Sequence, residues 1–328
     1  MLHMPIRPRR NRRNAVLRGF ARETTLDASR FIWPLFIHAG DGRQAIKSMP
    51  GCFRLSTAEL LKEVAAGVAD GVTSVVLFPA VDEALKNRTA DECWNPRGLV
   101  PETVRLLKQK WPDLCVITDV ALDPYNSDGH DGVVSEDGRI INDETVHILC
   151  KQALCHARAG ADIVSPSDMM DGRIGAIRTA LDSDGFQDVA ILAYTAKYAS
   201  AFYGPFRDAL DSAPKFGDKK TYQMDPANRR ESRREVALDE AEGADMVMVK
   251  PAGPYLDVIA DVRAATSLPV AAYQVSGEYA MLKAAAQNGW LDEKKAALES
   301  LLAIRRAGAD VILTYYAHQA ARWLAGKD

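Results

Sequence analysis

A short glycine-led phrase recurs along this chain, each time directly in front of an apolar run. Three copies read Gly-Ala-Asp, from Gly160, Gly243 and Gly308, and an earlier relative begins at Gly71 with Gly-Val-Thr. Glycine readily takes the left-handed conformation that ends a helix, and an apolar run without alternation is typical of a parallel strand buried on both faces. The phrase therefore predicts a repeated helix-to-strand joint, and this alternation of helices and strands is typical of an α/β fold.

The rest of the sequence continues this rhythm. We expect strands at 31–37, 73–78, 114–120, 161–165, 189–194, 245–250, 269–275 and 309–315. Helical stretches between them include 57–70, 101–110, 144–159 and 230–242. Eight strand-helix units in 328 residues favour the α/β class with a closed (β/α)8 TIM barrel, and a doubly wound open sheet is the weaker alternative. We expect one catalytic barrel domain at 31–328 behind an N-terminal arm at 1–30.

Composition and charge narrow the possible partners. The formal net charge is only -3, so bulk charge gives no reason to expect nucleic acid or membrane as a partner. The arginine-rich segment 7–13 is more readily interpreted as an arm for oligomer contacts than as a nucleic-acid site. The five cysteines include no C-x-x-C pair, which indicates neither a disulfide framework nor a thiolate zinc site. Without a signal-peptide pattern, we expect a cytoplasmic protein.

Two lysines stand at the ends of predicted strands. Lys250 closes the run DMVMVK, and Lys197 follows the run that ends at Tyr194. Active sites of (β/α)8 barrels lie at the carboxyl ends of the strands, where burial would lower a lysine pKa and leave a neutral amine able to attack a ketone. A single such lysine is more often a surface residue with a buried stem. Two in one pocket indicate carbonyl chemistry.

Two loops carry further candidates. The stretch DVALDPYNSDGHDG includes Asp119, Asp123 and Asp131, and its oxygen ligands suit a hard cation such as Mg2+, although a simple polar turn fits as well. The segment 198–230 has little periodicity, and long loops in compact domains are usually functional. We interpret it as an active-site lid rather than a mobile insertion.

Several long motifs together resemble one family. MVKPAGPYLDVI, SPSDMMDGR, AFYGPFRDA, YQVSGEYAM and TYYA are similar to segments of porphobilinogen synthase, also called 5-aminolevulinate dehydratase, and the resemblance covers nearly the whole chain. It implies condensation of two 5-aminolevulinate molecules to porphobilinogen with loss of two waters, in tetrapyrrole biosynthesis. A class I aldolase-like lyase, with one Schiff base, and a non-catalytic barrel scaffold remain the alternatives.

The resemblance also implies roles for individual residues. Lys250 would form a Schiff base with the substrate molecule that becomes the propionate side, and Lys197 would form the second. The resemblance places further residues near the substrate carboxylates or amino groups: Arg207, Lys219 and Gln223 on the lid, Ser276 and Tyr315 at the propionate side, and Asp119 and Ser167 near the amino groups. Lys219 stands where many relatives have arginine. An arginine side chain can donate two parallel hydrogen bonds to one carboxylate, whereas lysine presents a single compact charge.

Metal and assembly are the last points that the resemblance implies. Zinc-dependent members carry three cysteines where this chain has Ala121, Asp123 and Asp131, so no zinc is expected, and these two aspartates are candidates for another metal. Glu235 matches an allosteric magnesium ligand of the family at a subunit contact. No organic cofactor is implied. The family forms homo-octamers, in some cases hexamers.

Overall fold

The computed structural model describes residues 4–210 and 214–328. Its centre is a ring of eight parallel strands. These are β1 (Phe31–His38), β4 (Ser74–Ala80), β5 (Cys115–Val120), β8 (Ile163–Pro166), β9 (Ala190–Lys197), β10 (Met246–Lys250), β11 (Val270–Gln274) and β12 (Val311–Thr314). Pairing of β12 with β1, at Phe31 opposite Ile312, closes the ring. The closed (β/α)8 barrel is confirmed, and the open sheet is wrong.

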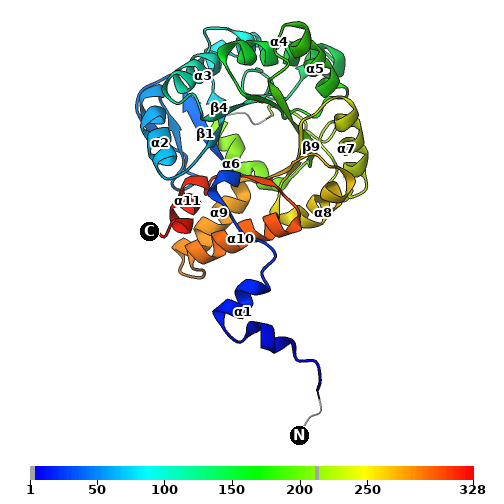
Figure 1. The fold of residues 1–328 in the computed structure, drawn as a ribbon. Coiled ribbons are helices and arrows are strands. Elements are labelled where there is room, and N and C mark those ends of the chain that lie inside the picture. Colours follow the sequence, from blue (N-terminus) through cyan, green and yellow to red (C-terminus); the bar gives the residue numbers. More distant parts are fainter. Residues whose placement is uncertain (1–3, 211–213) are drawn as a thin grey trace.

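Helices surround this ring (Figure 1). They are α2 (Thr57–Ala69), α3 (Leu99–Lys110), α4 (Asn142–Ala159), α5 (Arg173–Ser183), α7 (Glu231–Ala241), α8 (Leu256–Ala265), α9 (Ser276–Gln287), α10 (Glu293–Ala307) and α11 (Ala317–Leu324). The short strands β2 (Arg43–Ala45) and β3 (Phe53–Leu55) join the sheet beside β1, and β6 (Val133–Val134) and β7 (Ile140–Ile141) form a separate two-stranded sheet. Within the described ranges, no helix is both long and apolar enough to cross a membrane.

The recurrent joint has the expected glycine geometry. Gly160, Gly243 and Gly308 have φ of 100°, 99° and 126°, in the region that favours glycine. The aspartate that follows each of them has a role that the pattern did not reveal. Asp162 accepts a hydrogen bond from Val116 N at 2.8 Å, and Asp245 and Asp310 make the equivalent bond to the neighbouring strand at 2.7 and 3.0 Å. Each joint thereby satisfies a backbone donor at the beginning of an adjacent strand.

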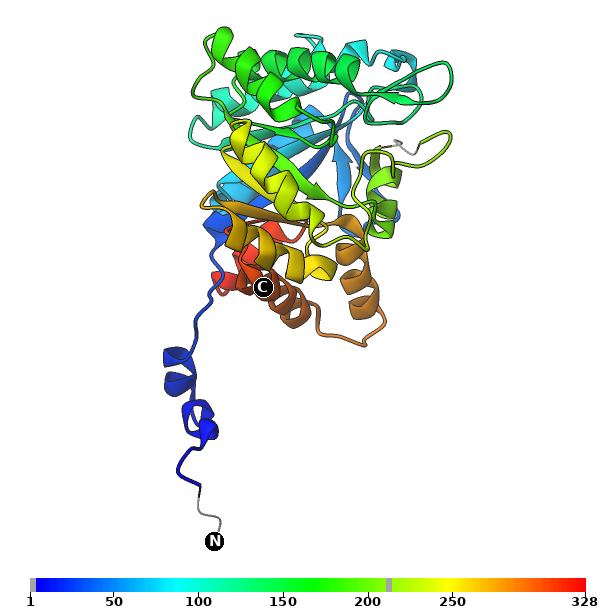
Figure 2. The same cartoon turned by 90° about the vertical axis from the view of Figure 1, so that its right-hand side faces the viewer.

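Segments outside the barrel lie at opposite ends of the molecule. Residues 4–30 extend away from it and contain η1 (Pro8–Arg12), α1 (Ala15–Phe20) and η2 (Ala28–Arg30) (Figure 2). In the expected lid, η5 (Ala201–Tyr203) and α6 (Gly204–Leu210) precede a stretch of turns and bends over 214–230. Residues 1–3 of the expected arm and 211–213 of the expected lid lie outside the described residues.

Candidate active site

The two lysines are neighbours at the carboxyl ends of two adjacent strands. Lys250 ends β10 and Lys197 ends β9, and their Cα atoms are register partners. Strand β9 extends through Lys197, so this lysine belongs to the strand and does not follow it as expected. Both side chains are buried, with 6% and 5% of their surface exposed. Two amines therefore face one enclosed space.

Lys250 lies in an aromatic box. Its Nζ is 4.8 to 5.1 Å from the ring centroids of Tyr194, Tyr203, Phe206 and Tyr273. Burial, and secondarily the charge of Lys197, lowers the pKa of Lys250 to about 7. A large share of this amine is therefore neutral near pH 7, while the ring faces can stabilise a cation formed on it.

Lys197 has polar partners instead. Its Nζ donates to the carbonyl oxygen of Ser167 and lies 3.3 Å from Asp131 Oδ1. The other carboxylate oxygen, Oδ2, accepts from Lys219 Nζ at 2.6 Å and from the Tyr222 hydroxyl at 2.9 Å. Burial alone would raise the pKa of Asp131, but the two ammonium groups outweigh it and hold this pKa below its ordinary value. Asp131 is thus an anion between two cations.

Lys219 lies between the two candidate metal-binding aspartates. Its Nζ is 3.4 Å from Asp123 Oδ2 and 2.6 Å from Asp131 Oδ2. Burial lowers the pKa of Lys219, but the charges of Asp123 and Asp131 outweigh it and raise the pKa. A metal ion bound by this pair would face the lysine ammonium at close range. In the part of the chain that the structure describes, no three histidine, cysteine or acidic side chains group as a metal site.

A small cavity of about 30 Å³ joins most of the expected site residues. Its lining includes the two lysines together with Asp119, Asp123, Asp131, Ser167, Arg207, Lys219 and Gln223. Burial, and secondarily the charge of Asp123, raises the pKa of Asp119 to about 7. About one water fills such a space, so substrate entry requires the surrounding segments to move.

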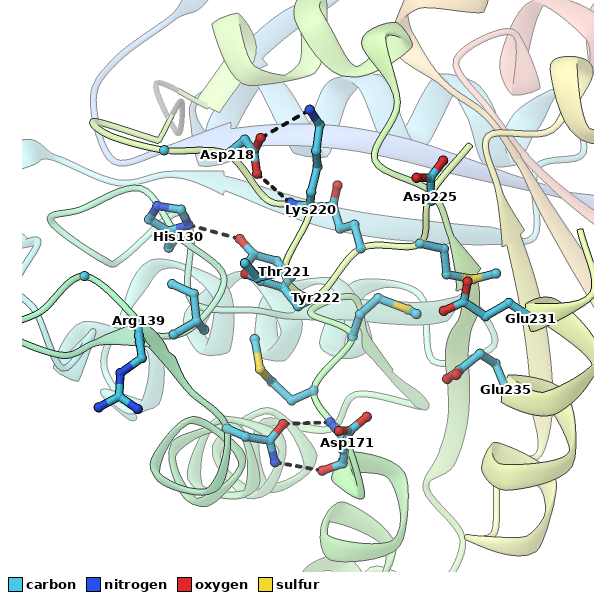
Figure 3. A pocket seen from close by; sticks show the side chains of 18 of the residues that line it. His130, Arg139, Asp171, Asp218, Lys220, Thr221, Tyr222, Asp225, Glu231 and Glu235 are labelled. Atoms are coloured by element: carbon cyan, nitrogen blue, oxygen red, sulfur yellow. Dashed lines mark hydrogen bonds and ion pairs between the residues drawn. The ribbon is translucent and has the colours of Figure 1, made fainter. Parts of the chain in front are cut away.

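Three expected residues lie outside this cavity. Ser276 Oγ is 3.3 Å from Phe202 O and accepts from Phe206 N at 3.0 Å. The hydroxyl of Tyr315 lies 2.8 Å from that of Tyr273, so Tyr315 stands one side chain behind the aromatic box. Glu235 lines a larger pocket of about 940 Å³, to which Lys220, Tyr222 and other lid residues also contribute (Figure 3). Gln223 lines both pockets.

Comparison with known proteins decides the family. The family model described as delta-aminolevulinic acid dehydratase matches residues 5–323. The chain is 66% identical over 327 residues to the delta-aminolevulinic acid dehydratase, chloroplastic, of Physcomitrium patens, covering 99% of this chain and 76% of that protein. The protein called delta-aminolevulinic acid dehydratase 1, chloroplastic, of Arabidopsis thaliana is 62% identical over the same length, again with 99% and 76% covered.

A solved structure agrees. The Toxoplasma gondii delta-aminolevulinic acid dehydratase (porphobilinogen synthase), in complex with the reaction product porphobilinogen, superposes with a TM-score of 0.98 at 56% identity, covering 98% of this chain and 92% of that one. The chain belongs to the delta-aminolevulinic acid dehydratase family. It is a lyase that condenses 5-aminolevulinate to porphobilinogen in tetrapyrrole biosynthesis. The aldolase-like and scaffold alternatives are wrong.

Membership of the dehydratase family also corrects the expected location. The relatives from Physcomitrium patens, Arabidopsis thaliana and Oryza sativa are named as chloroplastic proteins. This finding contradicts the expectation of a cytoplasmic protein. The expectation rested on a missing signal-peptide pattern, which gives no ground for choosing the cytoplasm over an organelle.

Sequence reasoning missed three residues around the dehydratase lysines. Tyr194 and Tyr273 form half of the aromatic box, and the Tyr222 hydroxyl donates to Asp131. The two box tyrosines lie within strands, where an aromatic residue is equally typical of a barrel core. The sequence around these two tyrosines therefore carries no signal that separates a site residue from a core residue.

Proposed function

We propose that Lys250 and Lys197 each form a Schiff base with one 5-aminolevulinate molecule, and that these two imines carry the condensation. The observation that supports this most directly is the register pairing of two buried lysines, one of which has a pKa of about 7. A neutral amine attacks the substrate ketone, and water leaves as the imine forms. The iminium then acidifies the adjacent carbon for C–C bond formation.

In this proposal, the other site residues bind the substrate carboxylates or orient the substrate amino groups. Arg207, Lys219 and Gln223 come from the lid segment and would hold the carboxylate of the substrate on Lys197. Ser276 and Tyr315 would hold the other substrate carboxylate after the aromatic box opens toward Tyr315. Asp119 and Ser167 would orient the amino groups, and a carboxyl group with a pKa of about 7 can both accept and return a proton near neutral pH.

Borohydride trapping tests the two imines. The protein is mixed with 5-aminolevulinate, reduced, and digested for peptide mass spectrometry. We expect label on Lys250 and on Lys197, and loss of porphobilinogen formation in Lys250→Ala and in Lys197→Ala. Lys110→Ala, at an exposed position on α3, is the control and should retain activity. Label on Lys250 alone, with normal turnover by Lys197→Ala, would show that one imine suffices.

Magnesium belongs to the larger pocket in this proposal. Glu235, Glu231, Asp171 and Asp225 all line this pocket (Figure 3), and one or two of these carboxylates would supply oxygen donors. Mg2+ commonly keeps several waters and uses one or two carboxylates, so a few protein oxygens are enough. The Asp123 and Asp131 pair does not fit a second metal, because Lys219 lies between them. Bound Mg2+ would supply positive charge at Glu235, away from the reacting lysines.

A chelation experiment separates magnesium binding from catalysis. We expect Mg2+ restored after chelation to raise activity and shift the oligomer distribution toward octamers, and to do neither in Glu235→Ala. Light scattering measures size in parallel with porphobilinogen formation. The exposed residues 7–13 of the arm would contact a neighbouring subunit in that assembly, with hexamers as the alternative. A wild-type magnesium response in Glu235→Ala would refute this assignment.

We also propose a chloroplast location, since the relatives with this name carry it. Fractionation of the source cells, followed by detection of the protein in the plastid fraction, tests it. Recovery only with a cytosolic marker would refute it.

A further inference from the structure

Glu278, in the first turn of α9, joins the loops that follow β10 and β11. Its Oε1 accepts from Gly253 N at 2.7 Å, and its Oε2 accepts from Val275 N at 2.8 Å and from Ala252 N at 3.3 Å. Ala252 and Gly253 lie just after Lys250, which ends β10, and Val275 follows β11. One side chain therefore holds two loops together at the carboxyl ends of neighbouring strands.

These two loops carry the two groups that are proposed to hold one substrate molecule. Lys250, at the start of the first loop, would bind the ketone, and Ser276, in the second, would bind the carboxylate. The pairing of β10 with β11 ends at Val249 opposite Ala272. Beyond that pair, hydrogen bonds to Glu278 connect the two loops.

The Glu278 carboxylate is enclosed without a balancing cation. The residue is 7% exposed, and in the described ranges its hydrogen-bond partners are backbone N–H groups alone. Burial raises its pKa to about 7, against the lowering effect of those N–H groups. A buried carboxylate without a cation is unfavourable for folding. A neutral side chain can cap a helix N-terminus without this disadvantage, so capping alone does not account for a carboxylate here.

Close packing makes the position of the first turn of α9 matter for the site. A Cβ on Gly253 would lie 2.6 Å from Glu278 Oε1, so glycine is needed for the carboxylate to reach this backbone. On the same turn, Ser276 Oγ accepts from Phe206 N at 3.0 Å, and Phe206 is one wall of the aromatic box around Lys250. A displaced turn would move both the hydroxyl and that wall.

We propose that Glu278 is a positioning residue that sets the distance between the Lys250 amine and the Ser276 hydroxyl, and that it thereby selects keto acids by chain length. In 5-aminolevulinate, two methylene groups separate the ketone from the carboxylate. A molecule with this spacing reaches both groups at once, whereas a longer one does not. Glu278 acts through the loops and does not touch the substrate. This inference rests on the proposed imine at Lys250 and the proposed carboxylate site at Ser276.

Trapping of Lys250 with three simple ketones measures this selection. Of these, 4-oxopentanoate has the substrate spacing, 5-oxohexanoate has one more methylene, and 2-butanone has no carboxylate and reports on the amine alone. Labelling by cyanoborohydride is followed on the Lys250 peptide at equal, subsaturating concentrations. In the wild type, we expect 4-oxopentanoate to label at least about tenfold faster than 5-oxohexanoate, because one methylene that misaligns the ketone has an effect of this size.

Two variants disturb the connection in different ways. Glu278→Gln keeps the shape of the side chain, but its NH2 group replaces one acceptor and faces a backbone N–H. Gly253→Ala keeps Glu278 and inserts a methyl group against its Oε1. We expect the ratio of the two acid rates to fall below about threefold in each variant, with 2-butanone labelling within about twofold of the wild type. Glu102→Gln, at an exposed position in the first turn of α3, is the control and should keep the wild-type ratio.

Ser276→Ala links the ratio to the carboxylate. It should lower the ratio as well, and the double variant Ser276→Ala/Glu278→Gln should match Ser276→Ala alone, because both changes act through one contact. Equal labelling by the two acids in the wild type would overturn the positioning role. A wild-type ratio in Glu278→Gln or Gly253→Ala, or loss of 2-butanone labelling in a folded variant, would overturn it as well.

Failure of the proposed function gives a different result. Absence of Lys250 label in the wild type with every ketone would overturn the imine itself. A 4-oxopentanoate rate that Ser276→Ala leaves unchanged would overturn the carboxylate site. The positioning role alone fails when both of these results are as expected and the ratio does not respond to Glu278→Gln.

Discussion

Lys197 should control the protonation of its neighbour Lys250. With a pKa of about 7, roughly half of the Lys250 amines are neutral at pH 7, against about one in a few thousand at the ordinary lysine value. Burial is the larger cause and the charge of Lys197 the second. The variant Lys197→Met removes that charge, keeps most of the volume and leaves burial nearly unchanged, so it isolates the second cause.

The size of the effect follows from the register of β9 and β10. The two lysines start from register partners on adjacent strands, and their Nζ atoms lie 6.0 and 5.0 Å from the ring centroid of Tyr194, so the two amines are close neighbours. Two like charges roughly 6 Å apart at an effective dielectric constant of about 20 repel by about 3 kcal/mol, which is about a hundredfold in proton affinity. Removing Lys197 should therefore move the titration of Lys250 to higher pH and lower its imine formation at pH 7 by about fiftyfold.

The assay follows imine formation and does not depend on turnover. The protein is mixed with 5-aminolevulinate and cyanoborohydride from about pH 6 to about pH 9, and the rate of label on the Lys250 peptide is measured by mass spectrometry. The labelling rate should rise with pH, because only the neutral amine attacks. In Lys197→Met, the pH range over which this rate rises should move to higher pH. Lys197→Arg keeps a permanent positive charge, so its labelling rate should depend on pH as in the wild type. The same pH dependence in all three proteins would refute the electrostatic coupling.

Three further predictions concern stability. Arg173→Met removes a buried guanidinium 3.5 Å from Asp168, and leaving that carboxylate without its partner should cost about 3 to 5 kcal/mol in urea unfolding. In Gly277→Ala the new Cβ would lie 2.6 Å from a backbone carbonyl oxygen, so we expect a loss of about 1 to 3 kcal/mol in the same measurement. Hydrogen bonds from Lys327 and other cations of the C-terminal region hold the pKa of Asp70 below 3.8, so its stabilisation is present above about pH 4 and is lost on acidification. Asp70→Asn should accordingly lower Tm at neutral pH and weaken the fall of Tm with acid.

The barrel was predictable because its signals are local. Each glycine joint and the strand after it are adjacent in the sequence, and burial of parallel strands on both faces gives continuous apolar runs. The end of β9 was the main error, since Thr195 interrupts the apolar run three residues after Leu192 and the strand nevertheless continues to Lys197. The Thr195 side chain is buried and interacts with Asp239 of α7, so a polar residue on the side of the strand that faces the helices does not end the strand.

The contacts around Asp131 could not be predicted in the same way. Tyr222 is 91 residues away along the chain and Lys219 belongs to the same distant segment, so their approach depends on how the lid segment folds back on the loop after β5. Sequence reasoning placed Asp131 in a possible metal site because oxygen-rich loops suit hard cations. The structure instead supplies the cation from the protein, as the ammonium of Lys219.

The two lysines look equivalent in the sequence, but their surroundings give them different chemical tasks. Lys250 is enclosed by four aromatic rings, and no hydrogen bond reaches its Nζ from the described residues, so burial favours the neutral amine. Lys197 is bonded to a carboxylate that stabilises its ammonium form. Different environments of paired ionisable groups separate their roles in catalysis. Lys250 can therefore attack a ketone as the neutral amine, whereas the Lys197 nitrogen is held by Asp131 and the Ser167 carbonyl oxygen, and this difference favours Lys250 as the first lysine to react.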